Sequence, residues 1–386
     1  MIVRKAHYGG THRVLSPSDT LARIEPHLSA IGVTRCADVT GLDRIGIPVF
    51  CAIRPRGKMI QVTNGKGLGH IDARVSALME ALEIFHAENL PKAAIRRASL
   101  QSMRAEGRVV VDPELLPHYR HETYFAPEFL IDWTVAEELV TAQQVWLPAS
   151  SVFFFSSPRL HDASSNGLAS GNELTEATLH ALYELIERDA ISRLGADGRI
   201  RLDPQRCECV DLDTLAEGPV RELVSALVKA DITLKLMRVK GSTPVHTFWA
   251  VLLDRAPLAH ASTVNTGYGA HLSPEVAATR AITEAAQSRL TYIHGAREDL
   301  HEESYNSDRA QAKLFAVFDR LEGTADWRYL EDRSSDDLSR DYRYVVDSLA
   351  EAGYRKIYRV DLTRPPFQLP VVKVLVPGLK FKERLF

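Results

Sequence analysis

The sequence predicts an α/β fold in which three strand–loop–helix units bring acidic helices together. Three segments carry nearly the same seven residues, and each pairs an acid with an acid or amide three positions further on, so that both polar groups share one helix face. Each segment follows an extended stretch and a polar loop. Because roughly 100 residues separate them, we expect related units rather than a solenoid, whose repeats span about 20–50 residues. The segments are residues 77–83, 181–187 and 281–287.

The first unit follows an N-terminal helix that the sequence predicts within residues 12–32. Apolar residues recur there at helical intervals, and Gly32 ends the pattern. The unit itself is expected to contain a strand at 59–62, a Gly-rich loop at 64–69 and a helix at 73–88.

The second unit is expected to begin with a strand at residues 152–155, where valine and phenylalanine form an apolar run. A polar loop at 164–171 follows. Asn172 is then suitably placed to cap a long helix over 173–194, because its side chain can accept a hydrogen bond from a free N–H of the first turn.

The third unit is predicted to contain a strand at residues 246–253, a loop at 266–270 and a helix that Ser273 caps. Pro274 would occupy the first helical position, where its fixed φ is compatible with the helix and its missing N–H is not needed. Further strands are expected at residues 233–239, 354–360 and 371–376.

Composition places the chain among ordinary globular proteins. Of its 386 residues, 45% are hydrophobic and 25% are charged. A formal net charge of −3 gives no general attraction to nucleic acid or anionic lipid. No apolar run reaches the roughly 18 residues of a membrane span, and residues 1–7 do not resemble a signal peptide. Four cysteines indicate no disulfide framework, so we expect a cytoplasmic protein with reduced thiols.

Carboxylates on the three repeated helices are the strongest functional signal. Charged groups within apolar helices are costly unless they bind something. Magnesium prefers carboxylate oxygens combined with phosphate oxygens and water. Solvated helix faces with internal ion pairs are the alternative, but acids embedded in apolar runs favour a magnesium site for a triphosphate. The acids are Glu80, Glu83, Glu176, Glu184, Glu187 and Glu284.

Basic residues accompany these acids. Arg188 follows the last acid of the second helix, and Arg280 and Arg289 flank Glu284 and Gln287, where guanidinium groups can hold phosphate oxygens. The Gly-rich segment 64–69 is neither a complete P-loop nor a complete dinucleotide fingerprint. Because it precedes an acidic helix, its lysine, Lys66, is a candidate phosphate contact.

Other motifs give weaker signals. Cys207 and Cys209 lack the spacing and the second pair of a zinc site. The chain has no His-Glu-x-x-His sequence and no Gly-x-Ser-x-Gly sequence. We interpret His180 and Tyr183 as surface and packing residues.

These segments resemble the YcaO family of ATP-dependent enzymes, which activate backbone amides of peptides. The likeness runs from about residue 13 to residue 376, so we expect one catalytic domain over residues 1–386, in which 1–150 and 151–386 would be subdomains. The phrase at residues 37–49 is similar to the opening of the family. The matching motifs are Ser76-x-x-x-Glu80-x-x-Glu83, residues 166–172 with 184–189, and Arg280-x-x-x-Glu284-x-x-Gln287-x-Arg289.

The resemblance implies a fold with mixed sheets and an ATP site unlike a P-loop. It implies magnesium ligands at Glu80, Glu83, Glu176, Glu184 and Glu187. It implies catalytic roles for Glu187, Arg188, Gln287 and Arg289. Contacts to the nucleotide are implied for Arg13, Thr20, Lys66, Ser76, Asn166, Asn172, Arg188, Arg280, Glu284, Gln287 and Arg289.

The chemistry that the resemblance implies is attack on a peptide carbonyl, ATP-dependent phosphorylation of its oxygen and loss of phosphate. Many azoline-forming members end in a Pro-x-Pro-x-Pro tail, whereas this chain ends in Leu385 and Phe386, with Pro377 as its last proline. The sequence also shows no additional leader-binding domain. Both departures favour a thioamide-forming enzyme that works beside a TfuA-like partner and uses an external sulfide.

Three alternatives remain open at this stage: an azoline-forming cyclodehydratase, a macroamidine-forming enzyme and a non-catalytic ATP-binding accessory protein. The expected cofactors are ATP and Mg2+. The expected partners are a precursor peptide or protein substrate and a TfuA-like or leader-binding protein, without nucleic acid or membrane. The sequence leaves open whether the chain forms a homodimer.

Overall fold

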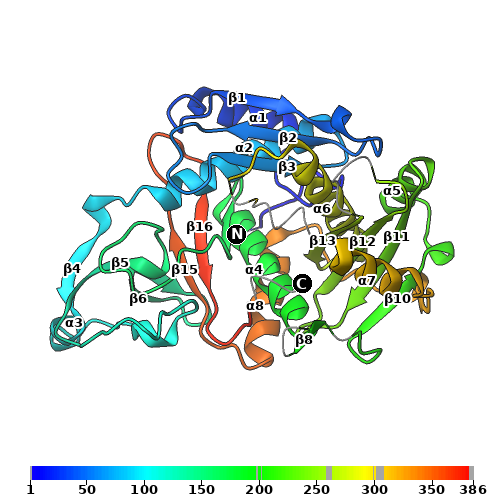
Figure 1. The fold of residues 1–386 in the computed structure, drawn as a ribbon. Coiled ribbons are helices and arrows are strands. Elements are labelled where there is room, and N and C mark those ends of the chain that lie inside the picture. The colour runs from blue at the N-terminus through cyan, green and yellow to red at the C-terminus, as the bar shows by residue number, and fades with distance from the viewer. Residues whose placement is uncertain are drawn as a thin grey trace.

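Three sheets and the helices between them make up the fold in the computed structural model, which describes residues 2–196, 199–200, 202–257, 263–298, 300 and 308–381. In Figure 1 the three-stranded sheet lies at the top, the six-stranded sheet to the left and the five-stranded sheet to the right. The predicted α/β class is confirmed. Leu385 and Phe386, on which the expectation about the tail rests, lie outside the described residues.

The three-stranded sheet is antiparallel, in the order β1 (Arg35–Asp38), β2 (Val49–Ile53) and β3 (Val62–Lys66). Helix α2 (His70–Glu88) packs along this sheet, and α1 (Pro17–Ile24) packs against α2. The N-terminal helix is therefore shorter than predicted, and a short 3-10 turn extends it.

Five strands of the six-stranded sheet follow the order β4-β5-β15-β16-β7. The sixth strand, β6, lies outside this order and pairs with β5. Helix α4 packs on β16 and β7, and helix α8 packs on α4 (Figure 1). The bounds are β4 Arg96–Ser99, α3 Leu100–Ala105, β5 Leu130–Glu138, β6 Gln143–Pro148, β7 Leu168–Ser170, α4 Leu174–Ser192, α8 Leu338–Glu351, β15 Tyr358–Asp361 and β16 Val371–Leu375.

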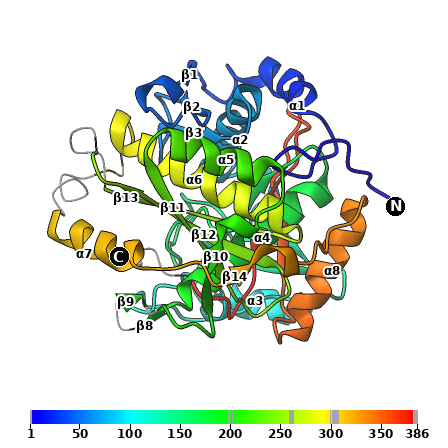
Figure 2. The same ribbon diagram turned by 90° about the vertical axis from the view of Figure 1, so that its right-hand side faces the viewer.

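The five-stranded sheet has the strand order β13-β12-β11-β10-β14, in which only the β10–β14 pairing is parallel. Figure 2 shows α5 and α6 side by side over this sheet, and both helices contact its strands. The bounds are β10 Cys207–Asp211, α5 Pro219–Lys229, β11 Ile232–Val239, β12 His246–Asp254, β13 Val264–His271, α6 Pro274–His294, α7 Asp308–Asp319 and β14 Ala325–Asp326; a separate pair consists of β8 Gly195–Ala196 and β9 Arg199–Ile200.

The three predicted units are present, but the strand of each unit lies where we expected its loop. β3, β7 and β13 are each the terminal strand of a different sheet, and each leads into an acidic helix. β3 contains Asn64 and Gly65, β7 ends at Ser170, and β13 contains Gly267 and Gly269. The loop prediction is therefore wrong for residues 266–270 and for the strand portions 64–66 and 168–170, whereas residues 67–69 and 164–167 do lie outside strands.

Glycine in these strands allows a helix backbone to approach the strand directly. A Cβ on Gly65 would lie 2.0 Å from the backbone nitrogen of Ala77 in α2. A Cβ on Gly267 would lie 2.1 Å from the backbone nitrogen of Ala285 in α6. No side chain fits at such distances, so glycine on the strand and alanine on the helix set the spacing of both units.

Two further strand predictions are wrong. Residues 152–155 are not a strand, although Val152, Phe153 and Phe154 are buried in the core around α2. An apolar run thus marks burial there without regular structure. Met59 to Gln61 are also outside a strand, because β3 begins only at Val62.

The core has several apolar clusters between sheets and helices, and they leave the polar faces of α2, α4 and α6 turned toward one another. The largest cluster lies between α2 and the six-stranded sheet, another lies under α5 and α6, and a third lies between α4, α8 and β16. Among the described residues, no helix combines the length and the apolar character that a bilayer crossing requires.

Candidate functional site

Helices α2, α4 and α6 contribute to one polar cleft with a volume of about 550 Å3. All but two of the residues that the sequence predicts for the site line this cleft. The lining residues among them are Arg13, Thr20, Lys66, Ser76, Glu80, Glu83, Asn172, Glu176, Glu184, Glu187, Arg188, Arg280, Glu284 and Gln287. The acids from three distant parts of the chain therefore share a cavity, as the repeated segments predicted.

The α2 face carries Ser76, Glu80 and Glu83, whose spacing of four and three residues aligns them along the helix. Ser170 of β7 donates a hydrogen bond to Glu83 over 2.6 Å. The pKa of Glu83 is raised from 4.5 to about 8, chiefly by burial; the hydrogen bond from Ser170 opposes the shift, and the negative charges of Glu80 and Glu184 add to it. Burial likewise raises the pKa of Glu80.

The α4 face carries Glu184 and Glu187. The backbone N–H of Gly167 donates to Glu184 over 3.1 Å. Burial raises the pKa of both carboxyl groups, and the negative charge of Glu284 adds to the shift at each. Arg188 lies 3.7 Å from Glu187, measured from Nε to the nearer carboxylate oxygen. Its charge lowers the pKa of both acids without cancelling the upward shift.

The α6 face carries Glu284, whose pKa is lowered, in contrast to the raised pKa values of the four acids on α2 and α4. Lys66 of β3 forms an ion pair with it at 2.7 Å, and the backbone N–H of Tyr268 donates to its other oxygen over 3.2 Å. Burial raises the pKa of Glu284, but Lys66 and Arg188 outweigh burial and hold the pKa below its usual value. The guanidinium of Arg188 also lies over the ring of Tyr268, 5.8 Å from its centroid.

Several buried polar atoms at the cleft have no hydrogen-bond partner in the described part of the chain. They are Nε of Arg188, Nε of Arg280 and Oε1 of Gln287. Buried donors and acceptors are normally satisfied in folded proteins, so orphaned atoms require an explanation. A bound polar ligand, with anionic groups for the two guanidinium donors, would satisfy them.

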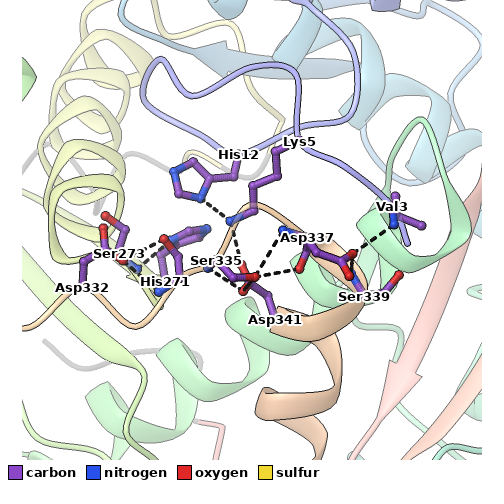
Figure 3. A network of polar contacts seen from close by, with 11 residues as sticks. Val3, Lys5, His12, His271, Ser273, Asp332, Ser335, Asp337, Ser339 and Asp341 are labelled. Carbon is purple, nitrogen blue, oxygen red and sulfur yellow. Dashed lines mark hydrogen bonds and ion pairs between the residues drawn. The ribbon is translucent and has the colours of Figure 1, made fainter. Parts of the chain in front are cut away.

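An N-terminal arm, residues 2–16, crosses the cleft and is fastened at three points. Figure 3 shows its root, where Lys5 forms a fully buried ion pair of 2.7 Å with Asp341 and a 2.8 Å hydrogen bond with His12. His7 lies 3.6 Å from Asp72 in the first turn of α2. Between these points, residues 9–11 line the cleft.

The third fastening point of the arm is Glu176. Its carboxylate accepts from Arg13 over 3.3 Å, from the backbone of Val14 over 2.8 Å and from the backbone of Asn172 over 3.0 Å. Asn172 in turn contacts Thr20 of α1 over 3.0 Å. These donors occupy the carboxylate, which favours a role for Glu176 in holding Arg13 and Asn172 over a role as a magnesium ligand.

The structure does not bring Arg289 and Asn166 to the cleft. Arg289 is enclosed on the opposite side of α6, where it lies 2.8 Å from Asp43 and 2.9 Å from Asp254. Arg289 is not among the residues that line the cleft, so its contact with a nucleotide stays a prediction that this arrangement does not favour. Asn166 lies in the turn before β7, and its buried side-chain oxygen has no partner among the described residues.

His180 and Tyr268 are cleft residues that the sequence reasoning missed. For His180 a signal existed, since it lies four residues after Glu176 and four before Glu184 and therefore shares their helix face. Burial and the nearby Arg280 hold the pKa of His180 well below its usual value, so its imidazole is neutral. Tyr268 lies in a segment for which the sequence predicts a loop, and no local pattern marks it as a site residue.

The donor set of the cleft fits magnesium held together with a polyphosphate. Burial is the main cause of the raised pKa values of the four clustered carboxyl groups, and a divalent cation bound among them would stabilise their ionised forms. Among the described residues, no three acidic, histidine or cysteine side chains surround one point closely enough to hold a metal alone. A magnesium ion that takes its remaining ligands from phosphate and water needs no such cage.

Comparison with known proteins adds a family likeness. Residues 64–380 match the sequence pattern described as YcaO cyclodehydratase, ATP- and Mg2+-binding. An uncharacterized protein of Methanothermobacter thermautotrophicus is 36% identical over 385 residues, which cover 95% of each chain. A protein of Rhizobium leguminosarum bv. trifolii, described by its place in the region 3′ of tfuA, is 33% identical over 382 residues, covering 95% of this chain and 88% of that one.

The likeness extends to solved structures. The structure of YcaO from Methanopyrus kandleri, bound with AMPPCP and Mg2+, matches this chain with a TM-score of 0.76 and 26% sequence identity. The match covers 98% of this chain and 95% of that one. The two proteins therefore share a similar fold over nearly the whole length of both chains.

Proposed function

The chain belongs to the YcaO family of ATP- and Mg2+-binding cyclodehydratases, and on that premise we propose that it uses ATP to activate a backbone amide of a peptide or protein. The observation that carries the proposal is the cleft, in which four glutamates lie beside guanidinium Nε donors that have no hydrogen-bond partner among the described residues. A site of this kind suits magnesium and a triphosphate better than it suits an apolar ligand.

Residues of the cleft divide into two groups in this proposal. Lys66, Arg188 and Arg280 would hold phosphate oxygens, because each is cationic and lines the cleft. Magnesium, when bound, would neutralise charge on the phosphates during transfer. Its protein ligands would be the carboxylates of α2 and α4: Glu80, Glu83, Glu184 and Glu187.

The proposed reaction has a simple balance. A nucleophile attacks the carbonyl carbon of the amide, and the carbonyl oxygen takes the γ-phosphoryl group of ATP, which leaves ADP. The phosphorylated oxygen then departs as inorganic phosphate. If the nucleophile is hydrosulfide, its sulfur loses a proton and remains double-bonded to carbon as a thioamide. Phosphorylation is needed because an unmodified amide oxygen is a poor leaving group.

Thioamide formation beside a TfuA-like partner is the product that we favour. The Rhizobium relative, described as a protein in the region 3′ of tfuA, is similar over almost all of this chain and supports that partner. The second candidate is azoline formation, in which a cysteine, serine or threonine side chain of the substrate is the nucleophile, and the description of the family as cyclodehydratases supports it. Both reactions require ATP, so the proposal also assigns the protein to the cytoplasm.

The test compares cells that carry the wild-type chain with cells that carry Glu187→Gln, using mass spectrometry of intact peptides and proteins. We expect one species that exchanges an oxygen for a sulfur only in wild-type cells. Loss of one water instead would establish the azoline alternative. Identical spectra in both cell lines, with both proteins expressed, would contradict the proposed function.

A further inference from the structure

Lys373 is a charged residue in the middle of an otherwise apolar strand. Its neighbours in β16, from Val371 to Leu375, are valines and a leucine, and every residue of the strand is buried. Lys373 itself is only 1% exposed. A buried ammonium is costly unless its hydrogens are satisfied, so its position requires a reason.

The ammonium of Lys373 binds the turn that precedes β7. Its Nζ donates to the backbone oxygen of Ser164 over 2.6 Å and to that of Asn166 over 2.7 Å. Among the described residues it forms no ion pair with a carboxylate. Burial lowers the pKa of Lys373 to about 8, while the charge of Glu184 opposes that shift, so the group stays cationic at neutral pH.

The same turn is fixed to β16 by its backbone. Gly167 accepts a 2.8 Å hydrogen bond from the backbone of Val374 and has a positive φ of 76°. A Cβ at Gly167 would lie 2.3 Å from the backbone oxygen of Val374. The turn therefore packs directly on β16. Lys373 binds the carbonyl groups of Ser164 and Asn166, which precede Gly167 in the same turn.

The turn and the strand that follows it donate hydrogen bonds to carboxylates of the cleft. The N–H of Gly167 donates to Glu184, and Ser170, three residues later in β7, donates to Glu83. β16 pairs with β7 along this stretch, with Lys373 opposite Leu168. One contiguous set of contacts thus runs from Lys373 through the turn to two of the proposed magnesium ligands.

We propose that Lys373 is a positioning residue of the magnesium site, which clamps the turn at residues 164–167 and thereby fixes Glu184 for the metal. This inference rests on the proposed function, because it assumes that Glu184 binds magnesium. Groups that orient metal ligands typically alter metal affinity or activity about 10–100-fold when they are removed. Lys373 touches neither metal nor substrate in this account.

The test measures Mg2+ binding by calorimetry in the presence of AMPPCP, together with the Mg2+ dependence of ATP turnover. Lys373→Met is expected to raise the half-saturating Mg2+ concentration about tenfold, with the maximal rate largely recovered at saturating Mg2+. Lys373→Arg keeps the charge and two donors, so we expect an intermediate shift of about threefold. Lys235→Met is the matched control, since Lys235 holds the backbone oxygen of Leu321 at 2.5 Å in the distant five-stranded sheet.

A double-mutant cycle with Glu184→Gln tests whether the effect passes through Glu184. We expect the Lys373 substitution to add no further loss of Mg2+ affinity in that background. The inference would be overturned if the Lys373 substitution reduced Mg2+ affinity equally in the wild type and in Glu184→Gln. An unchanged Mg2+ dependence of folded Lys373→Met would overturn it as well. If Lys373→Met does not fold, the cycle is run with Lys373→Arg and judged in the same way. If the wild-type protein binds neither Mg2+ nor AMPPCP, the proposed function is overturned as well.

Discussion

Gly65→Ala should damage both stability and nucleotide chemistry, because it alters the closest approach between β3 and α2. The added Cβ would lie 2.0 Å from the nitrogen of Ala77 and 2.2 Å from the oxygen of Ala73. Both contact atoms belong to the helix backbone, so no side chain can rotate away. Strand and helix must therefore separate.

The required displacement can be worked out from these distances. An ordinary van der Waals contact of a Cβ begins at 3.4 Å, so the strand must move by roughly 1.4 Å. Overpacking of this kind typically costs about 1–3 kcal/mol of stability. The displacement also moves Lys66, the next residue, relative to Glu80 on the helix, and a misplacement of about 1 Å can reduce a rate about 100-fold.

The assay is urea unfolding together with phosphate release from ATP in the presence of Mg2+. Gly41→Ala is the matched control, because a Cβ there would meet no atom within 4 Å. We expect a lower unfolding midpoint and a large loss of turnover for Gly65→Ala only. A Gly65→Ala protein with the stability and turnover of the wild type would refute the reasoning about strand–helix spacing.

Three further predictions concern charged groups. Arg289→Ala should lower the free energy of unfolding by about 3–5 kcal/mol, since the buried carboxylate of Asp43 loses its cation, while Asp254 keeps only its ion pair with Arg44. Glu187→Gln should leave the free energy of unfolding nearly unchanged and abolish calorimetric binding of AMPPCP with Mg2+. The reverse pattern would show that the two roles are exchanged. Without Mg2+, the raised pKa of Glu83 should contribute stability that is complete below pH 4.5 and is lost as the pH rises through 8, so urea midpoints should fall over that range in the wild type and fall less in Glu83→Gln. An equal fall of the urea midpoint with pH in the two proteins would contradict the assignment of this pH dependence to Glu83. Lys5→Met should lower the free energy of unfolding by about 3–5 kcal/mol, because Asp341 stays buried without its cation. The double substitution Lys5→Met with Asp341→Leu should recover much of that loss. An unchanged free energy of unfolding in Lys5→Met would contradict the anchoring of the arm.

The acidic helices were predictable from the sequence because their signal is local. Spacings of three and four residues align side chains on any α-helix, whatever surrounds it. Glu80 with Glu83, and Glu184 with Glu187, follow this rule, and the structure brings both pairs to the cleft. Because these acids are embedded in apolar segments, the sequence already indicates that the two pairs face a shared site and not bulk water.

The strands before these helices were not predictable by local preference. Glycine and asparagine are depleted in strands, and the sequence of β3 includes Asn64 and Gly65. Tertiary packing overrides that preference, since only glycine lets α2 approach so closely. Phe153 and Phe154 show the opposite case, where an apolar run lies in the core without forming a strand.

The family resemblance predicts Arg289 at the nucleotide, whereas helix geometry argues against that position. Arg289 lies two residues after Gln287, which at 100° per residue is about 200° around the helix. A side chain there cannot share the cleft face with Gln287 and Glu284. Its true partners, Asp43 and Asp254, come from distant parts of the chain, and no sequence pattern connects them.

A crystal structure of the protein with AMPPCP and Mg2+ tests the central claim most directly. The account predicts the triphosphate between α2, α4 and α6, with magnesium bound by Glu80, Glu83, Glu184 and Glu187 and with Arg188 on a phosphate. A nucleotide bound outside this cleft, or metal ions without contact to these four carboxylates, would contradict it.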